Sequence, residues 1–335
     1  MHVRRDARLA ELTTLAVGGP IDRLVEVTDA AELVSAVREA DEAGRPLLVL
    51  GGGSNVVAPD DGWPGDVVAV RTRGVDRSAD RLRVAAGEDW DTLVARTVEE
   101  GLAGMEALAG IPGSTGATPV QNVGAYGQEV AQTITAVRVW DRAEKVERTL
   151  PPAECGFDYR DSRLKREPGR FVVLDVTFLL HPSPVSRPVT YAELARRLGI
   201  EVGGTAPLTD VRAAVLELRR GKGMVLDPGD PDSRSAGSFF TNPIVPSDRA
   251  VTGCPTWPAG DGLVKLSAAW LVQHAGFGRG TREGRVGTSS KHSLALTTEP
   301  GASATELLAF ADRVAAAVQE RFGVTLTREP TAVAP

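Results

Sequence analysis

Three short segments of the chain carry side chains that could act together on a reacting anion. Arg160 lies in the run YRDSRLK, Ser238 in the run AGSFFTNP and Glu329 in the run TLTREP. A guanidinium can donate two parallel hydrogen bonds to a carboxylate, a hydroxyl can deliver a proton, and a carboxyl can supply charge or a proton. Ser238 lacks the G-x-S-x-G pattern of a hydrolase nucleophile, which argues against hydrolysis. Taken singly, the three residues are more typical of a solvated arginine, a turn serine and a solvated tail glutamate.

A glycine-rich loop, GGGSN at residues 51–55, follows the apolar run 47–50 and could bring a cofactor to these side chains. Glycine lets backbone N–H groups approach an anion without an intervening side chain. The loop is not the dinucleotide turn G-x-G-x-x-G, because Val56 continues into a strand-like segment, and it lacks the G-K-[ST] of a P-loop. By turn chemistry alone, a tight structural turn explains it equally well.

A second loop, residues 110–127, gives a stronger indication of a ligand site. It holds five glycines in eighteen residues, together with the neutral hydrogen-bonding side chains of Ser114, Thr115, Thr118, Gln121 and Asn122. Such groups suit a pyrophosphate or the edge of a heterocycle. Long ordered loops are more often functional than idle, so this segment is predicted to bind a ligand.

Strands and helices alternate around these loops. Strands are predicted at residues 21–27, 47–50, 67–70, 82–85, 134–140 and 171–180. Helices are predicted at residues 30–43, 91–100, 208–220, 267–273 and 304–322, the first with Asp29 as N-cap and Gly44 just past its end. Residues 181–188, rich in proline and serine, are predicted to be a linker. The pattern predicts an α+β fold with a separate C-terminal domain.

Composition excludes several classes of protein. The net charge of -6 is not that of a protein that coats nucleic acid, although a local cationic pocket could still bind a small anion. Cys155 and Cys254 have no metal-ligand spacing, so no metal site is predicted. No run approaches the roughly 20 apolar residues of a bilayer span. We expect a cytoplasmic monomer that binds neither nucleic acid nor membranes.

The two glycine loops, in this order and spacing, resemble the FAD-binding domain of the vanillyl-alcohol-oxidase and p-cresol-methylhydroxylase (PCMH) superfamily. The strings IPGS at 111–114, PVQNVGAYG at 119–127 and GSFFTNP at 237–243 are closer still to the type I branch of the UDP-N-acetylenolpyruvoylglucosamine reductase (MurB) family. This resemblance extends over nearly the whole chain, from about Thr13 to Glu329.

The resemblance implies a PCMH-type FAD-binding domain of two subdomains, residues 1–76 and 77–207. A C-terminal α+β substrate-binding domain would span 208–322, and a closing strand with Glu329 would span 323–335. It also implies which residues contact a non-covalent FAD. They are Gly51, Gly52, Gly53, Ser54, Asn55, Ile111, Pro112, Gly113, Ser114, Gly116, Ala117, Gln121, Asn122, Gly124, Ala125, Tyr126 and Gly127.

The family resemblance further implies the reaction: NADPH reduces the FAD, and the flavin then reduces UDP-N-acetylglucosamine enolpyruvate to UDP-N-acetylmuramate, a cell-wall precursor. Hydride addition pushes negative charge onto the enolpyruvyl carboxylate, so the reaction needs a cation there and a proton donor at the neighbouring carbon. Arg160 and Glu329 correspond to the residues that stabilise this charge, and Ser238 corresponds to the proton donor. The family usually has a glutamate where Thr327 stands here.

Four further residues match substrate contacts of the family: Tyr159, Tyr191, Lys222 and Asn242. Tyr191 matches the tyrosine of a loop that covers the UDP-sugar, and Lys222 matches a lysine near its diphosphate. No role is assigned to His292, which falls where the family pattern varies.

Two other functions remain open from the sequence. One is an oxidase on the same FAD-binding fold, many of which hold the flavin covalently through a histidine of the first glycine loop. None of His2, His181, His274 and His292 lies near residues 51–55, which argues for non-covalent FAD. The other is a protein that binds FAD without turnover, which the presence of Arg160, Ser238 and Glu329 argues against.

Overall fold

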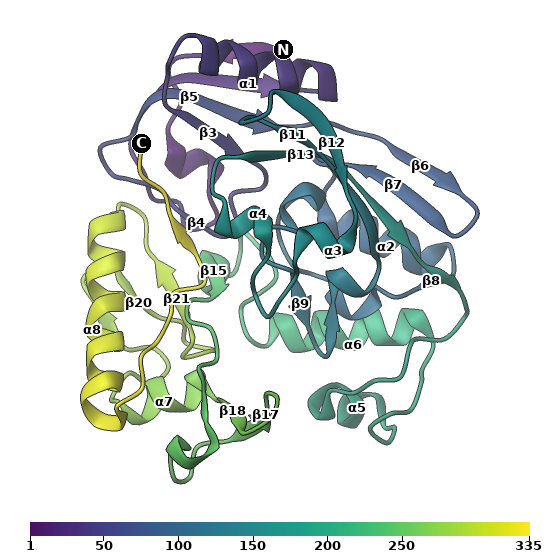
Figure 1. Ribbon diagram of the computed structural model, residues 1–335. Coiled ribbons are helices and arrows are strands. Elements are labelled where there is room, and N and C mark those ends of the chain that lie inside the picture. The colour runs from purple at the N-terminus through teal and green to yellow at the C-terminus, as the bar shows by residue number, and fades with distance from the viewer.

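The computed structural model describes all 335 residues. The chain begins with a mixed sheet in the strand order β1-β2-β5-β3, in which β2, β5 and β3 run parallel. The four strands span His2–Arg4, Ile21–Val27, Trp63–Val70 and Leu47–Leu50. Helix α1 (Ala30–Glu42) covers this sheet at the top of Figure 1, and the Asp29 side chain accepts a hydrogen bond from the Glu32 N–H at its start. Central strand β5 is almost wholly buried, as parallel strands covered on both faces usually are.

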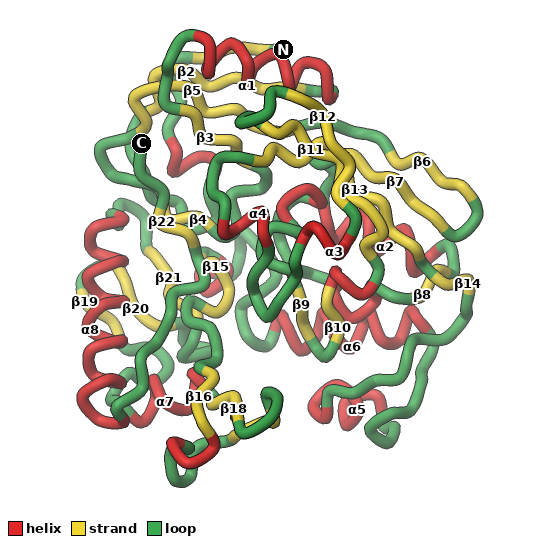
Figure 2. Tube along the Cα trace, in the orientation of Figure 1, coloured by secondary structure: helices red, strands yellow, loops and turns green.

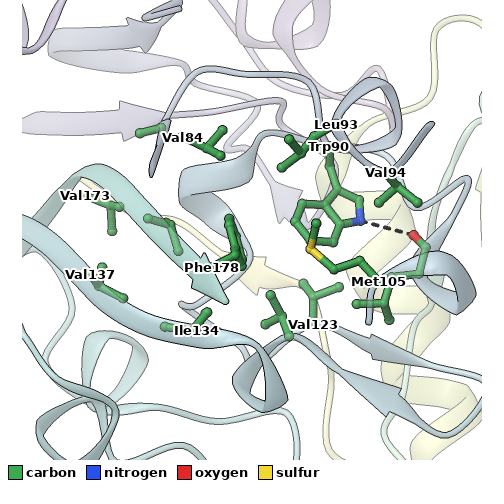
Figure 3. Packing of buried hydrophobic residues seen from close by; sticks show 14 of the residues in the cluster. Val84, Trp90, Leu93, Val94, Met105, Val123, Ile134, Val137, Val173 and Phe178 are labelled. Atoms are coloured by element: carbon green, nitrogen blue, oxygen red, sulfur yellow. Dashed lines mark hydrogen bonds between the residues drawn. The ribbon is translucent and has the colours of Figure 1, made fainter. Parts of the chain in front are cut away.

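A second, antiparallel sheet has the strand order β12-β11-β13-β7-β6. These strands span Val146–Leu150, Ile134–Asp141, Phe171–Leu179, Arg81–Ala85 and Val75–Ser78. Helix α2 (Trp90–Glu99) and helix α6 (Leu208–Arg220) pack beside it, and its core merges with one face of the first sheet. Figure 3 shows Trp90 and Phe178 in this core, where the Trp90 indole N–H donates to the Leu108 carbonyl oxygen.

A third sheet, β15-β21-β20-β19, is antiparallel and lies with helices α7 and α8 in a separate hydrophobic core. Its strands span Ser235–Ser238, Ala295–Thr298, Val286–Thr288 and Arg282–Glu283, and the helices span Ala268–His274 and Ala304–Phe322. A small sheet, β16-β18-β17, extends from this region. Its strands span Ile244–Pro246, Leu263–Leu266 and Thr256–Pro258. Helix α8 is yellow in Figure 1 and stands at the side of the molecule away from β6 and β7.

Short elements connect these three parts. Two-residue strands pair as β8 with β14, β9 with β10, and β4 with β22. They span Leu102–Ala103, His181–Pro182, Gly124–Ala125, Gln128–Glu129, Val56–Val57 and Thr331–Ala332. The remaining α-helices are α3 (Pro152–Cys155), α4 (Arg163–Arg166) and α5 (Ala192–Leu198). No helix combines the length and the apolar character that a bilayer crossing requires.

The pairing of β22 with β4 decides where the C-terminal segment lies. After α8 the chain runs back past β15, and Thr331 and Ala332 pair in parallel with Val56 and Val57, directly after the first glycine loop. Figure 2 shows β22 beside β4, on the left of the view between the N-terminal sheet and β21. The end of the chain is therefore held against the N-terminal sheet rather than left as a free tail.

The structure confirms the mixture of helices and sheets that the sequence predicted, and α6 and α8 have the predicted bounds. The predicted linker at residues 181–188 is partly wrong, because His181 and Pro182 form β14. The predicted closing strand is also too long. Only two parts of this segment pair as strands: Arg328, in a single bridge with Phe240, and β22. Glu329 and Pro330 lie between these two parts, and Pro330 interrupts the pairing because it has no N–H to donate.

The domain boundaries stay predictions. Helix α6 packs on α2 and contributes to the core of the second sheet, whereas the C-terminal sheet has its own core. We therefore propose that the C-terminal domain begins after α6 rather than at residue 208.

Asp60 joins the N-terminal sheet region to α8. Its carboxylate accepts hydrogen bonds from the Ala304 N–H (2.7 Å), the Thr305 N–H (2.8 Å) and the Thr305 hydroxyl (2.7 Å), where the helix has unpaired N–H groups and a positive dipole end. Burial acts to raise the pKa of Asp60, but the bonds from Thr305 and Ala304 outweigh it and hold that pKa below its usual value.

Replacing Asp60 with asparagine is expected to lower the free energy of unfolding by about 1–2 kcal/mol at neutral pH, by analogy with loss of a helix cap. Because the folded-state pKa is depressed, this stability is present above the unfolded-state pKa and is lost as the pH falls through the folded-state value. Thermal melts at neutral and acidic pH measure the difference. Asp61→Asn, at the exposed neighbour, is the control, and equal melting temperatures for the two variants at neutral pH would contradict the prediction.

Candidate active site

The two glycine loops meet the C-terminal segment around one cavity of about 330 Å³, within the usual range for small-molecule sites. Its walls come from β15, from α4 and from the segment before β22, elements that lie close together near the middle of Figure 1. The predicted residues that line it are Gly51, Gly52, Gly53, Ser54, Asn55, Ile111, Pro112, Gly113, Ser114, Ala117, Gln121, Gly124, Arg160, Ser238 and Glu329. All three predicted catalytic residues thus face the predicted cofactor loops.

The glycines of the first loop are required by its contact with the second. A Cβ added at Gly52 would lie 2.6 Å from the Cα of Gly113, and one added at Gly51 would lie 2.2 Å from Ser114 Oγ. Gly53 has a φ of 63° and approaches the Leu12 carbonyl so closely that no side chain fits. The GGG sequence therefore lets two backbone segments touch and leaves their polar edges on the cavity wall.

Arg160 and Glu329 form an ion pair at the cavity. Arg160 Nε lies 3.3 Å from Glu329 Oε1, and the side chains are only 19% and 15% exposed. The Arg160 guanidinium also donates to the Gly124 carbonyl oxygen in the second loop. Burial raises the pKa of Glu329, while the positive charges of Arg160 and Lys165 oppose that rise.

The backbone N–H and the backbone carbonyl of Glu329 are both hydrogen-bonded. Its N–H donates to the Phe239 carbonyl oxygen (2.9 Å), and its carbonyl oxygen accepts from the side-chain amide of Asn55 (3.2 Å). The Asn55 carbonyl in turn accepts from the Thr331 N–H (3.0 Å), at the start of β22. The first glycine loop thus helps to fix the backbone of Glu329, whose carboxyl group lies beside Arg160.

Ser238 is placed by a bulge at the end of β15. The pairing of β15 with β21 shifts register between Ser235 and Ser238, and Gly237 adopts a φ of 69°, which glycine tolerates. The next residue, Phe239, is fully buried and its N–H donates to the Leu294 carbonyl (2.8 Å). The two phenylalanines after the serine anchor the strand, and Ser238 is left on the cavity wall.

Tyr159 and Asn242 line a second cavity on the other side of Arg160. The ammonium of Lys265, on β18, lies 3.7 Å from the centre of the Tyr159 ring, a cation–π contact. Burial raises the pKa of Tyr159. The side-chain oxygen of Asn242 accepts from the Ala268 N–H (2.9 Å) at the start of α7, so this asparagine also holds a helix end.

Tyr191 and Lys222 lie in neither cavity. The Tyr191 ring meets Tyr126 edge to face with ring centres 5.4 Å apart, and Lys222 Nζ lies 2.7 Å from a Glu193 carboxylate oxygen. Burial, with a smaller contribution from Lys222, lowers the pKa of His292 to about 4, so this imidazole is neutral at physiological pH. Substrate contact by Tyr191 and Lys222 stays a prediction.

Five predicted cofactor residues also lie in neither cavity, namely Gly116, Asn122, Ala125, Tyr126 and Gly127. Asn122 braces the loop, since its amide donates to Glu129 (2.9 Å) and to the Asp158 carbonyl (3.0 Å). Gly116 allows close contact with Ala86, whose Cβ would lie 2.5 Å from an added Cβ. Their contact with FAD stays a prediction.

Arg219 is a cavity residue that the sequence analysis missed. It is 8% exposed, burial lowers its pKa, and its Nε has no hydrogen-bond partner in the protein. A signal was present in the sequence, because Val211, Val215 and Arg219 recur at helical spacing on the buried face of α6. A largely buried guanidinium that lines a cavity favours an anionic ligand there.

Comparison with known proteins identifies the family. Residues 230–333 match the family model described as the C-terminal domain of UDP-N-acetylenolpyruvoylglucosamine reductase, and residues 21–150 match an FAD binding domain. The UDP-N-acetylenolpyruvoylglucosamine reductase of Thermobifida fusca is 53% identical over 347 residues, covering 98% of this chain and 97% of the relative. The chain belongs to the UDP-N-acetylenolpyruvoylglucosamine reductase family.

Other members of the reductase family agree with this assignment. The Streptomyces coelicolor enzyme of the same name is 53% identical and covers 98% of this chain and 89% of the relative. The crystal structure of the reductase (MurB) from Thermus caldophilus superposes with a TM-score of 0.70 at 28% identity, covering 99% of each chain. The predicted family, α+β fold and FAD cofactor are therefore confirmed.

The residues present fit the FAD that this reductase family uses. The cavity wall combines glycine loops, whose exposed backbone can approach phosphate, with the positive charge of Arg219. No histidine lines the cavity, so it offers no side chain of the kind that tethers flavins covalently.

Proposed function

We propose that Arg160, Ser238 and Glu329 form the catalytic site with which this chain reduces UDP-N-acetylglucosamine enolpyruvate to UDP-N-acetylmuramate, with NADPH as the reductant. The observation that carries the proposal is that all three line one cavity together with both glycine loops. FAD, when bound, accepts hydride from NADPH and supplies it to the enolpyruvyl group. The reaction is a step of peptidoglycan precursor synthesis.

The side chains have separate tasks in this proposal. Arg160 binds the enolpyruvyl carboxylate, where its fixed charge stabilises the negative charge that hydride addition creates. Glu329, in its protonated form, donates a hydrogen bond to the same developing anion. Ser238 delivers a proton from Oγ to the carbon next to the carboxylate. The distance of 3.3 Å from Arg160 Nε to Glu329 Oε1 supports this division because it places the guanidinium and the carboxyl group side by side.

The substrate side of the site is proposed to lie toward Tyr159 and Asn242, which share the second cavity with Arg160. Tyr191 and Lys222 are proposed to contact the UDP-sugar from the segment around α5. We also propose that the protein works as a cytoplasmic monomer. Light scattering of the FAD-loaded protein tests the monomer.

An anaerobic experiment in two steps tests the function. NADPH is expected to bleach the flavin, and subsequent addition of UDP-N-acetylglucosamine enolpyruvate is expected to restore its absorbance. Acid precipitation of the holoenzyme is expected to leave the yellow colour in the supernatant, as for non-covalent FAD. A flavin that stays reduced after addition of the enolpyruvyl substrate would overturn the proposal.

The rate of flavin reoxidation is expected to fall as the pH rises through the pKa of Glu329. Burial raises that pKa, Arg160 and Lys165 are the charged groups that oppose the rise, and the protonated form is the one required here. Glu329→Gln, which cannot ionise, is expected to react more slowly and to remove this limb of the pH profile. Single-turnover reoxidation measured from mildly acidic to mildly alkaline pH gives the profile.

Glu320→Gln, at an exposed position of α8, is the matched control and should keep the pH profile of the unmodified protein. A reoxidation rate that rises with pH over this range would mean that the carboxylate, rather than the acid, is the active form.

A further inference from the structure

Lys165 is a cation at the centre of the site to which neither the sequence motifs nor the proposed mechanism assigns a role. It lines both cavities, next to Arg160 in each. Its ammonium donates to the carbonyl oxygen of Arg160 (2.9 Å), and no carboxylate lies within ion-pair distance of it. A lysine at a polar surface usually pairs with water or an acid, so a lysine bound to the backbone of the proposed catalytic arginine requires an explanation.

The backbone of Arg160 supplies that explanation, because it is strained. Arg160 has a φ of 54°, in the left-handed region that side chains other than glycine, asparagine and aspartate rarely adopt. It lies in a tight turn in which the Asp158 N–H bonds to the Asp161 carbonyl (3.0 Å) and the Asp161 N–H bonds to the Asp158 carbonyl (3.2 Å). Strained residues persist at functional sites only where their surroundings hold them in place.

The left-handed conformation decides where the Arg160 side chain points. It sends the guanidinium toward the Gly124 carbonyl oxygen of the second glycine loop and toward Glu329. Relaxation of the turn to an ordinary backbone conformation would turn the side chain away from these partners. The bond from Lys165 is made to the carbonyl of the strained residue itself, so it opposes that relaxation directly.

The backbone of Lys165 is itself anchored to the second glycine loop. It lies in helix α4, whose N-cap, Ser162, is fully buried. The Ser162 hydroxyl donates to the Val120 carbonyl oxygen and accepts from the Lys165 N–H (3.3 Å), which ties α4 to the second glycine loop. The Cα of Lys165, from which the side chain extends, is therefore fixed relative to the second glycine loop.

We propose that Lys165 is a positioning residue, whose ammonium holds Arg160 in the left-handed conformation that aims its guanidinium at the substrate carboxylate. The inference rests on the proposed function of Arg160. Lys165 is also one of the two positive charges that oppose the rise in the pKa of Glu329, so its charge acts on both members of the ion pair.

Lys165→Met keeps most of the stem and removes the ammonium. The rate constant for flavin reoxidation at saturating UDP-N-acetylglucosamine enolpyruvate is expected to fall about 10- to 100-fold, the effect of a slightly misplaced catalytic group. The dissociation constant of that substrate and the rate of flavin reduction by NADPH are expected to change much less. Lys165→Arg, which keeps a donor, is expected to recover part of the lost rate. Arg163→Met, on the same helix but bonded to Glu167 instead, is the matched control.

A double-mutant cycle separates positioning from direct substrate contact. If Lys165 acts through Arg160, then Lys165→Met added to an Arg160→Met protein should cause little further loss. Independent, multiplying losses would overturn the proposal, as would a weaker substrate affinity with an unchanged rate constant for Lys165→Met. If Lys165→Met fails to keep its thermal melt and FAD content, the same cycle is run with Lys165→Gln. A failure of the unmodified protein to reoxidise its flavin would instead reject the proposed function itself.

Discussion

Replacing Ser238 with alanine is expected to leave flavin reduction by NADPH within about twofold of the unmodified rate and to slow flavin reoxidation by the enolpyruvyl substrate about 10²- to 10⁴-fold, the usual contribution of a general acid. The reason is that the hydroxyl is needed only when a proton reaches the substrate carbon. The bulge in β15 and the buried Phe239 after it hold this hydroxyl at the cavity, and a methyl group there has no proton to give.

Stopped-flow measurement of both half-reactions on the same preparation distinguishes this effect from general damage to the site. Ser247→Ala, at an exposed position outside both cavities, is the control and should resemble the unmodified protein in both. Equal slowing of the two half-reactions by Ser238→Ala would indicate a disturbed flavin site and would count against the role of Ser238. Unchanged rates in both would remove it from the mechanism.

Replacing Arg160 with methionine is expected to slow flavin reoxidation about 10²- to 10³-fold, as loss of a single preorganised donor to a developing anion does. The guanidinium is the fixed positive charge at the proposed position of the enolpyruvyl carboxylate. Its removal also leaves Glu329 buried without its nearest cation, which should raise the pKa of that carboxyl further. The pH at which reoxidation declines should therefore move upward in the variant.

Arg160→Lys is the informative companion, because it keeps the charge but loses the planar fork that reaches both Gly124 and Glu329. We expect an intermediate rate, measured by single-turnover reoxidation at saturating substrate. If Arg160→Met lowered only the affinity for substrate and left the rate constant intact, Arg160 would be a binding residue without a role in stabilising the transition state.

Helices were the part of the fold most open to prediction from sequence. Helix α8 has an apolar face at helical spacing, a Ser303–Glu306 capping box and Gly323 in a left-handed conformation after its last residue, so both ends and the buried face are encoded locally. The short helix α5 was not predicted. Its seven residues follow Tyr191 without a side-chain N-cap, and they are too few to show a helical period of apolar residues.

The short strand pairs could not be predicted for a different reason. Strands such as β4 and β22 have two residues each, and they pair because distant parts of the chain meet, which no local pattern indicates. The same holds within the site. The motifs around Arg160, Ser238 and Glu329 indicated which residues could react, but the ion pair between Arg160 and Glu329 and the bond from Lys165 depend on tertiary contacts. The sequence shows Arg219 as a charged residue on the apolar face of a predicted helix, but it does not indicate that this residue lines the cavity.

The pairing of β22 with β4 has a consequence for synthesis of the protein. A ribosome makes both glycine loops, Arg160 and Ser238 well before it makes Glu329 and β22, so the proposed acid is the last of the proposed site residues to be synthesised. Domains generally fold in order of synthesis, so the last strand to emerge must find its partner beside an already folded loop. A polypeptide cut short before residue 329 would lack both the proposed acid and the β22 pairing that lies beside the first glycine loop.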